Sequence, residues 1–169
     1  MRAVRYSKTR RWSRSACPRI SVEVNDRARI LCPTDFSEPS AGALEFAASL
    51  AERLGAELHL LHVYHLPLYA LPQVMPLPTP DFAAELARAV NASLAALVEQ
   101  LAGRGISAVP HLAEGVPYEV IVDKAVELGA EQIVMGTHGR TGLGHALLGS
   151  IAERVVRASP VPVTTVRAP

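Results

Sequence analysis

The chain of 169 residues is 49% hydrophobic with a net charge of +1, which suits one globular domain and leaves no room for two ordinary ones. No apolar run reaches the roughly 18 to 20 residues of a membrane span, and the N-terminus lacks the apolar region of a secretory signal. We therefore expect a cytoplasmic protein with no membrane partner, whose two cysteines, Cys17 and Cys32, match no metal or redox spacing.

The small net charge hides a basic leader in front of an acidic body. The first 22 residues carry seven of the 17 basic residues and no acidic one, which leaves ten basic residues against 16 acidic ones. Because the leader lacks periodic apolar residues, we expect residues 1–27 to be a basic, disordered extension and residues 28–169 to be the folded domain. Apart from nonspecific contact by this extension, we expect no nucleic-acid partner.

From Arg29 onward, short apolar runs alternate with helical patterns, which predicts strands of a parallel sheet separated by helices. The first strand is expected at residues 29–32, and Ser37 is the predicted N-cap of the helix that Gly55 ends. The inward face of this helix is predicted to contain Leu44, Ala47, Leu50, Ala51 and Leu54.

The second strand is expected at residues 57–63. His59 and His62 lie three residues apart on it and so point to opposite faces, which favours core or surface histidines over metal ligands. Residues 64–80 contain five prolines, so neither a helix nor an interior strand can run through them. This stretch is interpreted as a surface excursion that serves as a lid, an interface or a variable insertion.

The second half of the chain repeats the alternation. A helix from Pro80 is followed by strands at residues 106–112, 132–135 and 161–166, with helices from Pro117 and Ser150 between them. The helix from Pro80 is predicted to bury Phe82, Leu86, Val90, Leu94, Leu97 and Leu101. The last helix is predicted to bury Ile151, Val155 and Val156.

A glycine-rich stretch, GTHGRTGLGHALLGS at residues 136–150, joins the fourth strand to the last helix. Gly136 ends the strand, Gly139 allows the backbone to approach a ligand, and Gly149 with Ser150 opens the helix. The first turn of a helix presents unpaired N–H groups and a partial positive charge, so this arrangement suits an anionic group.

The position of the site follows from the fold class. In open parallel sheets, ligands lie at the carboxyl ends of the strands where the winding direction reverses. The sequence Pro33-Thr34-Asp35 follows the first strand and Met135-Gly136 ends the fourth, so the two segments would meet if these strands are neighbours.

These residues resemble the universal stress protein family, in particular its ATP-binding branch. The pattern of that branch is G-x2-G-x9-G-[S/T], and Gly136, Gly139, Gly149 and Ser150 occupy all four fixed positions. The likeness covers residues 29–167 and implies a single doubly wound, Rossmann-like α/β domain of the adenine nucleotide alpha hydrolase type. It further implies a five-stranded parallel sheet in the order 3-2-1-4-5, with four helices.

The resemblance also implies a ligand, ATP, with Mg²⁺ or Mn²⁺ held by the phosphates. By likeness, Asp35 and the backbone near Pro33 and Thr34 contact adenine or ribose, and Val63 and Met135 provide apolar contacts to the base. The residues around the ribose and phosphates would be Gly136, Gly139, Arg140, Gly149, Ser150 and Ile151.

Three of these residues have a simpler alternative. Asp35 can serve as a turn or capping residue, Ser150 can be the N-cap of its helix, and Arg140 can be solvated on its loop. For Ser150 the two roles are compatible, because it can cap a helix and contact a phosphate through different atoms.

The chain has no G-x4-G-K-[S/T] loop, no G-x-G-x-x-G after its first strand and no nucleophile elbow. We therefore expect an ATP-binding regulatory module that acts in stress adaptation through nucleotide-dependent conformation or partner binding, rather than an enzyme. The alternative is a slow ATP hydrolase or phosphoryl-transfer enzyme that uses the same pocket. The resemblance also implies a homodimer through the last strand, residues 161–166, at the sheet edge.

Overall fold

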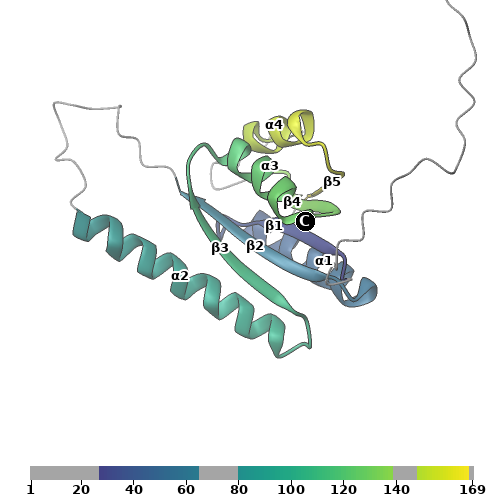
Figure 1. The fold of residues 1–169 in the computed structure, drawn as a ribbon, viewed down its shortest axis with the longest axis horizontal. Helices are drawn as coiled ribbons and strands as arrows, with labels where there is room; N and C mark the ends of the chain where they lie inside the picture. The colour runs from purple at the N-terminus through teal and green to yellow at the C-terminus, as the bar shows by residue number, and fades with distance from the viewer. Residues whose placement is uncertain (1–26, 65–79, 139–147, 168–169) are drawn as a thin grey trace, which may run out of the picture.

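The computed structural model of the protein describes residues 27–64, 80–138 and 148–167 (Figure 1). Five strands alternate with four helices along the chain. Their order is β1 (Arg29–Pro33), α1 (Glu38–Leu54), β2 (Glu57–Tyr64), α2 (Pro80–Ala102), β3 (Ala108–Glu114), α3 (Pro117–Leu128), β4 (Gln132–Gly136), α4 (Ser150–Ala158) and β5 (Val163–Val166).

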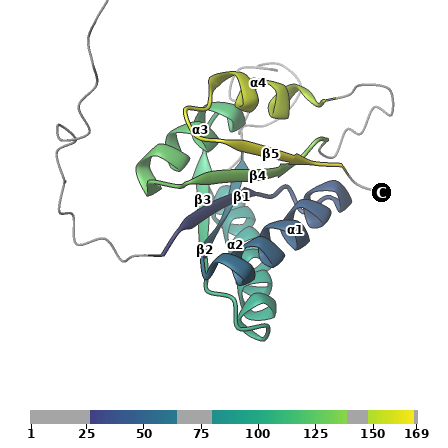
Figure 2. The ribbon, with the colours of Figure 1, turned by 90° about the vertical axis from the view of Figure 1, so that its right-hand side faces the viewer.

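The strands form one parallel sheet in the order β3-β2-β1-β4-β5. Figures 1 and 2 show α1 and α2 on one face of the sheet and α3 and α4 on the other. This arrangement confirms the doubly wound α/β fold and the predicted strand order. The winding direction reverses between β1 and β4, the two neighbours that are not consecutive in the chain.

Alternation along each strand divides the core into two parts. In β1, Ile30 and Cys32 pack with α1 and α2, whereas Leu31 packs with α3 and α4. In β2, Leu60 and Leu61 divide in the same way. Because side chains of a strand alternate between faces, a sheet covered by helices on both sides needs apolar residues at consecutive positions. This requirement explains the continuous apolar runs of the sequence.

The predicted ends of α1 are confirmed. The Ser37 hydroxyl accepts a hydrogen bond from the backbone N–H of Ser40, and Gly55 ends the helix in the left-handed conformation with φ of 63°. None of the helices in the described part of the chain is long and apolar enough to cross a membrane.

Four residues predicted to be inward are exposed instead: Leu54, Leu86, Ile151 and Val156. Leu54 lies in the last turn of α1 and Leu86 near the start of α2, where Figure 1 shows the helix reaching beyond the sheet. In α4 the buried residues are Ala152 and Val155. A nine-residue helix packs through a narrow stripe, so the residues beside that stripe stay in solvent.

Strand boundaries differ from the prediction by one or two residues. β3 begins and ends two residues later than expected, because its register pairs Leu58 with Ala108 and Tyr64 with Glu114. β5 is shorter and begins at Val163. The expected extension and most of the proline-rich excursion, residues 1–26 and 65–79, lie outside the described residues.

A pair of histidines links β2 to β3 on the face covered by α3. Nδ1 of His59 lies 2.9 Å from Nε2 of His111, and Nε2 of His59 lies 3.2 Å from Oε2 of Glu57. Burial and the charge of Arg29 lower the pKa of His59, against the raising effect of Glu57. Burial, His59 and Lys124 lower the pKa of His111, against the effect of Glu127 and Glu57.

Lowering the pH from about 7.5 to about 5.5 is expected to reduce the free energy of unfolding, since both histidine pKa values lie below the ordinary value of about 6.5. Below that value the unfolded chain takes up protons that the folded pair does not bind. One such histidine contributes a slope of at most about 1.4 kcal/mol per pH unit. Urea unfolding across this range measures the slope, which should decrease in the double variant His59→Leu, His111→Leu. An unchanged slope in that variant would contradict the prediction.

Candidate functional site

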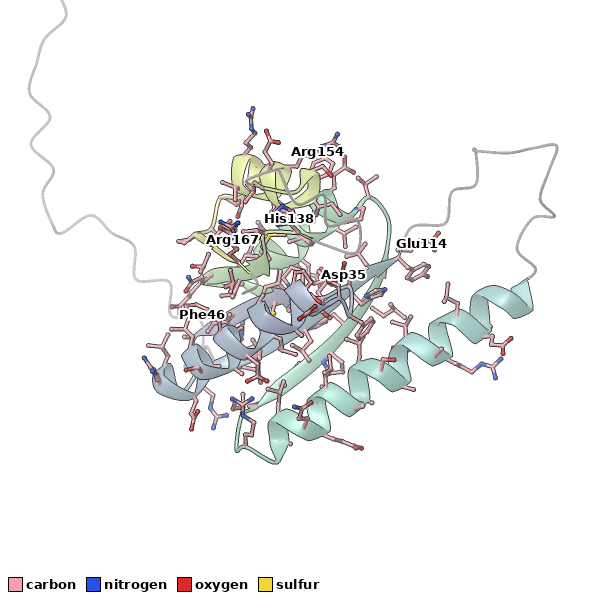
Figure 3. The ribbon with its side chains drawn as sticks, turned by 180° about the vertical axis from the view of Figure 1, so that it is seen from behind. Asp35, Phe46, Glu114, His138, Arg154 and Arg167 are labelled. Carbon is pink, nitrogen blue, oxygen red and sulfur yellow. The ribbon has the colours of Figure 1, made fainter. Side chains whose placement is uncertain are left out.

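The ends of β1 and β4 meet at the carboxyl edge of the sheet. The two strands are paired, with Leu31 beside Ile133. A Cβ atom placed on Gly136 would lie 3.0 Å from the carbonyl oxygen of Pro39, which shows how closely the start of α1 approaches the end of β4. Figure 3 shows Asp35 and His138 in the region between the ribbons of α1 and α4. We call this region the carboxyl-edge site and define it by residues 33–35, 63, 135–138 and 149–151.

The start of α4 is attached to the end of β4 by backbone contacts. The N–H of Gly149 donates to the carbonyl of Thr137 at 2.7 Å, and the N–H of Thr137 donates to the carbonyl of Val166 at 2.9 Å. A Cβ atom on Gly149 would lie 3.0 Å from the Thr137 oxygen, so a larger residue would force the two segments slightly apart. The two ends of the glycine-rich stretch therefore lie together, whereas Gly139 and Arg140 lie outside the described residues.

The start of α4 presents backbone donors at its exposed end. Gly149 is the N-cap, and among the described residues no side chain caps it. Ser150 is therefore the first residue of the helix rather than its N-cap, and its side chain is exposed, as is that of Ile151. Glu153 adds an acidic group to the first turn but pairs with Arg157 at 3.0 Å. The N–H groups of this turn suit an anion.

Asp35 stabilises the turn between β1 and α1, as one of the two interpretations of its sequence position predicted. Its Oδ1 accepts hydrogen bonds from the backbone N–H of Ser37, at 3.1 Å, and from the Ser37 hydroxyl. This geometry fixes the carboxylate at the beginning of α1, within the carboxyl-edge site. A turn role and a ligand contact use the same carboxylate and are compatible.

The backbone of Thr34 is already used inside the protein. Its N–H donates to the carbonyl of Leu61 at 2.8 Å, and its carbonyl accepts a hydrogen bond from Nδ1 of His62, also at 2.8 Å. A carbonyl oxygen has a second lone pair, but the N–H has a single hydrogen. Of these two backbone groups, therefore, the carbonyl is the one that can make an additional contact.

Val63 and Met135 lie on the strands that flank β1, and both pack on the face covered by α3 and α4. Val63 is partly buried, whereas Met135 is 6% exposed. The structure thus places both predicted apolar residues on the same face of the sheet, at its carboxyl edge. Met135 presents little surface there because most of its side chain belongs to the core.

Sequence reasoning did not include Thr137 among the site residues. Its backbone joins the ends of β4 and β5 to the start of α4, and its hydroxyl lies 3.0 Å from Nδ1 of His138. The position between Gly136 and Gly139 in the glycine pattern was the signal that could have identified it.

A family model described as the universal stress protein family matches residues 27–167. The chain belongs to this family. A universal stress protein of Methanocaldococcus jannaschii, MJ0531, is 34% identical over 143 residues, which cover 83% of this chain and 82% of the relative. YxiE, a universal stress protein of Bacillus subtilis, is 33% identical over 146 residues, or 82% and 98% of the two chains. The resemblance to this family, stated from the sequence, is thereby confirmed.

Solved structures of the family share the fold. The structure of UspA from Lactobacillus plantarum matches with a TM-score of 0.72 and 27% identity, covering 85% of this chain and all of that one. A universal stress protein in complex with cAMP matches with a TM-score of 0.58 and 22% identity. The universal stress protein from Archaeoglobus fulgidus in complex with dAMP matches with a TM-score of 0.57 and 23% identity. At these identities the likeness of the last two is one of fold.

Replacing Gly136 with alanine is expected to lower the free energy of unfolding by about 1 to 3 kcal/mol, because the new Cβ atom would meet backbone atoms that cannot move independently. Gly42 provides a matched control in α1, since a Cβ atom there would meet nothing within 4 Å. Gly42→Ala should stabilise the protein by about 0.5 to 1 kcal/mol. Urea unfolding measures both variants, and equal effects of the two substitutions would show that the close approach at Gly136 is unimportant.

Proposed function

We propose that this universal stress protein is an ATP-binding regulatory module of the cytoplasm, which acts in stress adaptation through nucleotide-dependent conformation or partner binding. The observation that carries the proposal is the meeting of two segments distant in sequence, the turn after β1 and the glycine-bounded start of α4. Together with Val63 and Met135, they offer a carboxylate, an apolar wall and a helix N-terminus along one edge of the sheet.

Each part of the nucleotide has a matching chemical group at the carboxyl-edge site. The Asp35 carboxylate accepts hydrogen bonds from the exocyclic amine of adenine or from ribose hydroxyls, and Val63 with the exposed part of Met135 contacts the flat base. The N–H groups at Ser150 and Ile151 bind the phosphate oxygens, whereas the N–H of Gly149 donates to Thr137 and lets the backbone approach closely. The glycine pattern adds Gly139 and Arg140 to the phosphate contacts.

A divalent cation, Mg²⁺ or Mn²⁺, would reach the site with the nucleotide. Across residues 27–64, 80–138 and 148–167 no group of three His, Cys, Asp or Glu side chains is arranged to hold a metal ion. We therefore assign the cation to the phosphate oxygens, which are the ligands that Mg²⁺ commonly uses in nucleotide sites.

Relatives with this fold support the choice of an adenine nucleotide. One solved universal stress protein holds cAMP and another holds dAMP. These two complexes support the view that the fold can hold an adenylate. The proposal for this chain rests on its own residues Asp35, Gly136, Gly149 and Ser150.

Isothermal titration with ATP and Mg²⁺, on protein freed of co-purified nucleotide, is expected to show one site per chain. Asp35→Asn keeps an oxygen for the turn but removes the charge, so it should raise the Kd about tenfold or more, given about 1.5 to 3 kcal/mol for a hydrogen bond to a charged group. Asp123→Asn, at an exposed position of α3, is the matched control and should leave the Kd unchanged. No heat at millimolar ATP would rule out the proposed function.

We also propose a homodimer through β5. This strand is at the sheet edge, and the carbonyls of Pro162 and Val166 accept hydrogen bonds from the β4 side. Because backbone groups alternate along a strand, those of Val163 and Thr165 point away from β4 and are suited to pairing with a second chain.

Light scattering at tens of micromolar protein is therefore expected to report a dimer. Thr165→Pro removes an outward N–H without touching the bonds to β4, and it should shift the protein towards monomer. A wild-type monomer under these conditions would contradict the proposed dimer, and a Thr165→Pro dimer would place the interface elsewhere.

A further inference from the structure

We propose that His62 is a positioning residue for the carboxyl-edge site, because its imidazole holds both neighbours of Asp35 and thereby fixes the direction of that carboxylate. The inference rests on the proposed function, since Asp35 is the residue assigned to the nucleoside. It adds a residue of β2 that makes no contact with the ligand in that assignment.

His62 is 9% exposed and lies at the carboxyl end of β2. It follows Leu58 and Leu60 at even spacing, so it points to the face of α1 and α2, whereas Val63 points to the face of α3 and α4. Val63 and His62 are adjacent in β2 and lie on opposite faces of the sheet at the same carboxyl edge. In the proposal Val63 contacts the base, whereas His62 contacts the turn after β1.

The first contact of His62 is with the residue before Asp35. Its Nδ1 lies 2.8 Å from the carbonyl oxygen of Thr34. A carbonyl can only accept, so Nδ1 carries the hydrogen and donates it. The last residues of β1 and β2 that pair in the sheet are Pro33 and Leu61. The bond from His62 to Thr34 therefore links β2 to the turn that follows β1.

The second contact of His62 is with the residue after Asp35. The imidazole stacks on the ring of Phe36, with 4.8 Å between centroids and 29° between planes. Phe36 has a φ of 61°, a left-handed conformation that is rare for a bulky residue and costs about 1 to 3 kcal/mol. Its N–H also donates to the Thr34 hydroxyl at 3.1 Å, so the turn is closed on itself beside the imidazole.

The strain at Phe36 is difficult to explain by stability alone. Phe36 is 36% exposed and belongs to neither part of the core, and glycine would adopt the same backbone conformation without strain. Strained residues that persist commonly lie at binding sites, where the surrounding contacts maintain a geometry that the ligand requires. Here His62 contacts the residues on both sides of Asp35, and the hydrogen bonds of Phe36 to Thr34 and of Ser37 to Asp35 complete the turn.

Three substitutions test this role by titration with ATP and Mg²⁺. His62→Leu removes the donor and should raise the Kd about tenfold, within the range of coupling between neighbouring sites. His62→Asn places an amide donor where Nδ1 stood but loses the ring stack on Phe36, so it should raise the Kd less than His62→Leu does. His59→Leu is the matched control, because His59 is also a buried histidine of β2 but lies on the other face and makes no contact with this turn.

A fourth variant separates positioning from stability. Phe36→Gly relieves the left-handed strain and removes the ring stack, so it should keep or raise the midpoint of thermal unfolding while it raises the Kd for ATP severalfold. A residue with a purely structural role would move stability and affinity in the same direction. This variant also keeps the test valid if His62→Leu does not fold.

The amide chemical shifts of Asp35, Phe36 and Ser37 provide a readout without nucleotide. They should move in His62→Leu, return towards wild type in His62→Asn and stay unchanged in His59→Leu. If the wild-type protein does not bind ATP, the proposed function is wrong. The chemical shifts would still report whether His62 holds the turn. Wild-type affinity in both His62→Leu and Phe36→Gly, or a loss in His59→Leu equal to that in His62→Leu, would overturn the positioning role.

Discussion

The pairing of β1 with both β2 and β4 is the constraint on which the rest of the molecule depends. From β1 the chain winds through α1 and α2 on one face and returns through α3 and α4 on the other. Crossovers between parallel strands are almost always right-handed, so the two halves must diverge at this point. The divergence leaves the carboxyl ends of β1 and β4 side by side.

At that edge the decisive contacts are made by backbone atoms. Gly136 and Gly149 each bring a Cα atom so close to carbonyl oxygens that an added Cβ would be about 3.0 Å away. The hydrogen bond from Gly149 to Thr137 then holds the start of α4 against the end of β4. A site built in this way keeps its shape through backbone geometry, while side chains such as Asp35 provide the chemistry.

The helix periodicities identified all four helices of the described residues but overestimated how much of three of them is buried. Leu54, Leu86, Ile151 and Val156 fit an inward pattern and are exposed, because they lie near helix ends or beside a narrow contact stripe. Periodicity reports which side of a helix is apolar, whereas the length of the sheet beneath it determines which turns are covered. Met135 of β4, which the resemblance assigned to the base, is 6% exposed and belongs largely to the core.

The sequence by itself determined the alternation of strands and helices, the capping of α1 by Ser37 and Gly55, and the glycine spacing that identified the family. These features are local, since each depends on residues within a few positions of one another. The tertiary structure decided that both backbone groups of Thr34 are engaged, and that His62 reaches Thr34 and Phe36 from a neighbouring strand. Such contacts depend on strand register, and the pattern of a single strand does not state which residues its neighbour will place beside it.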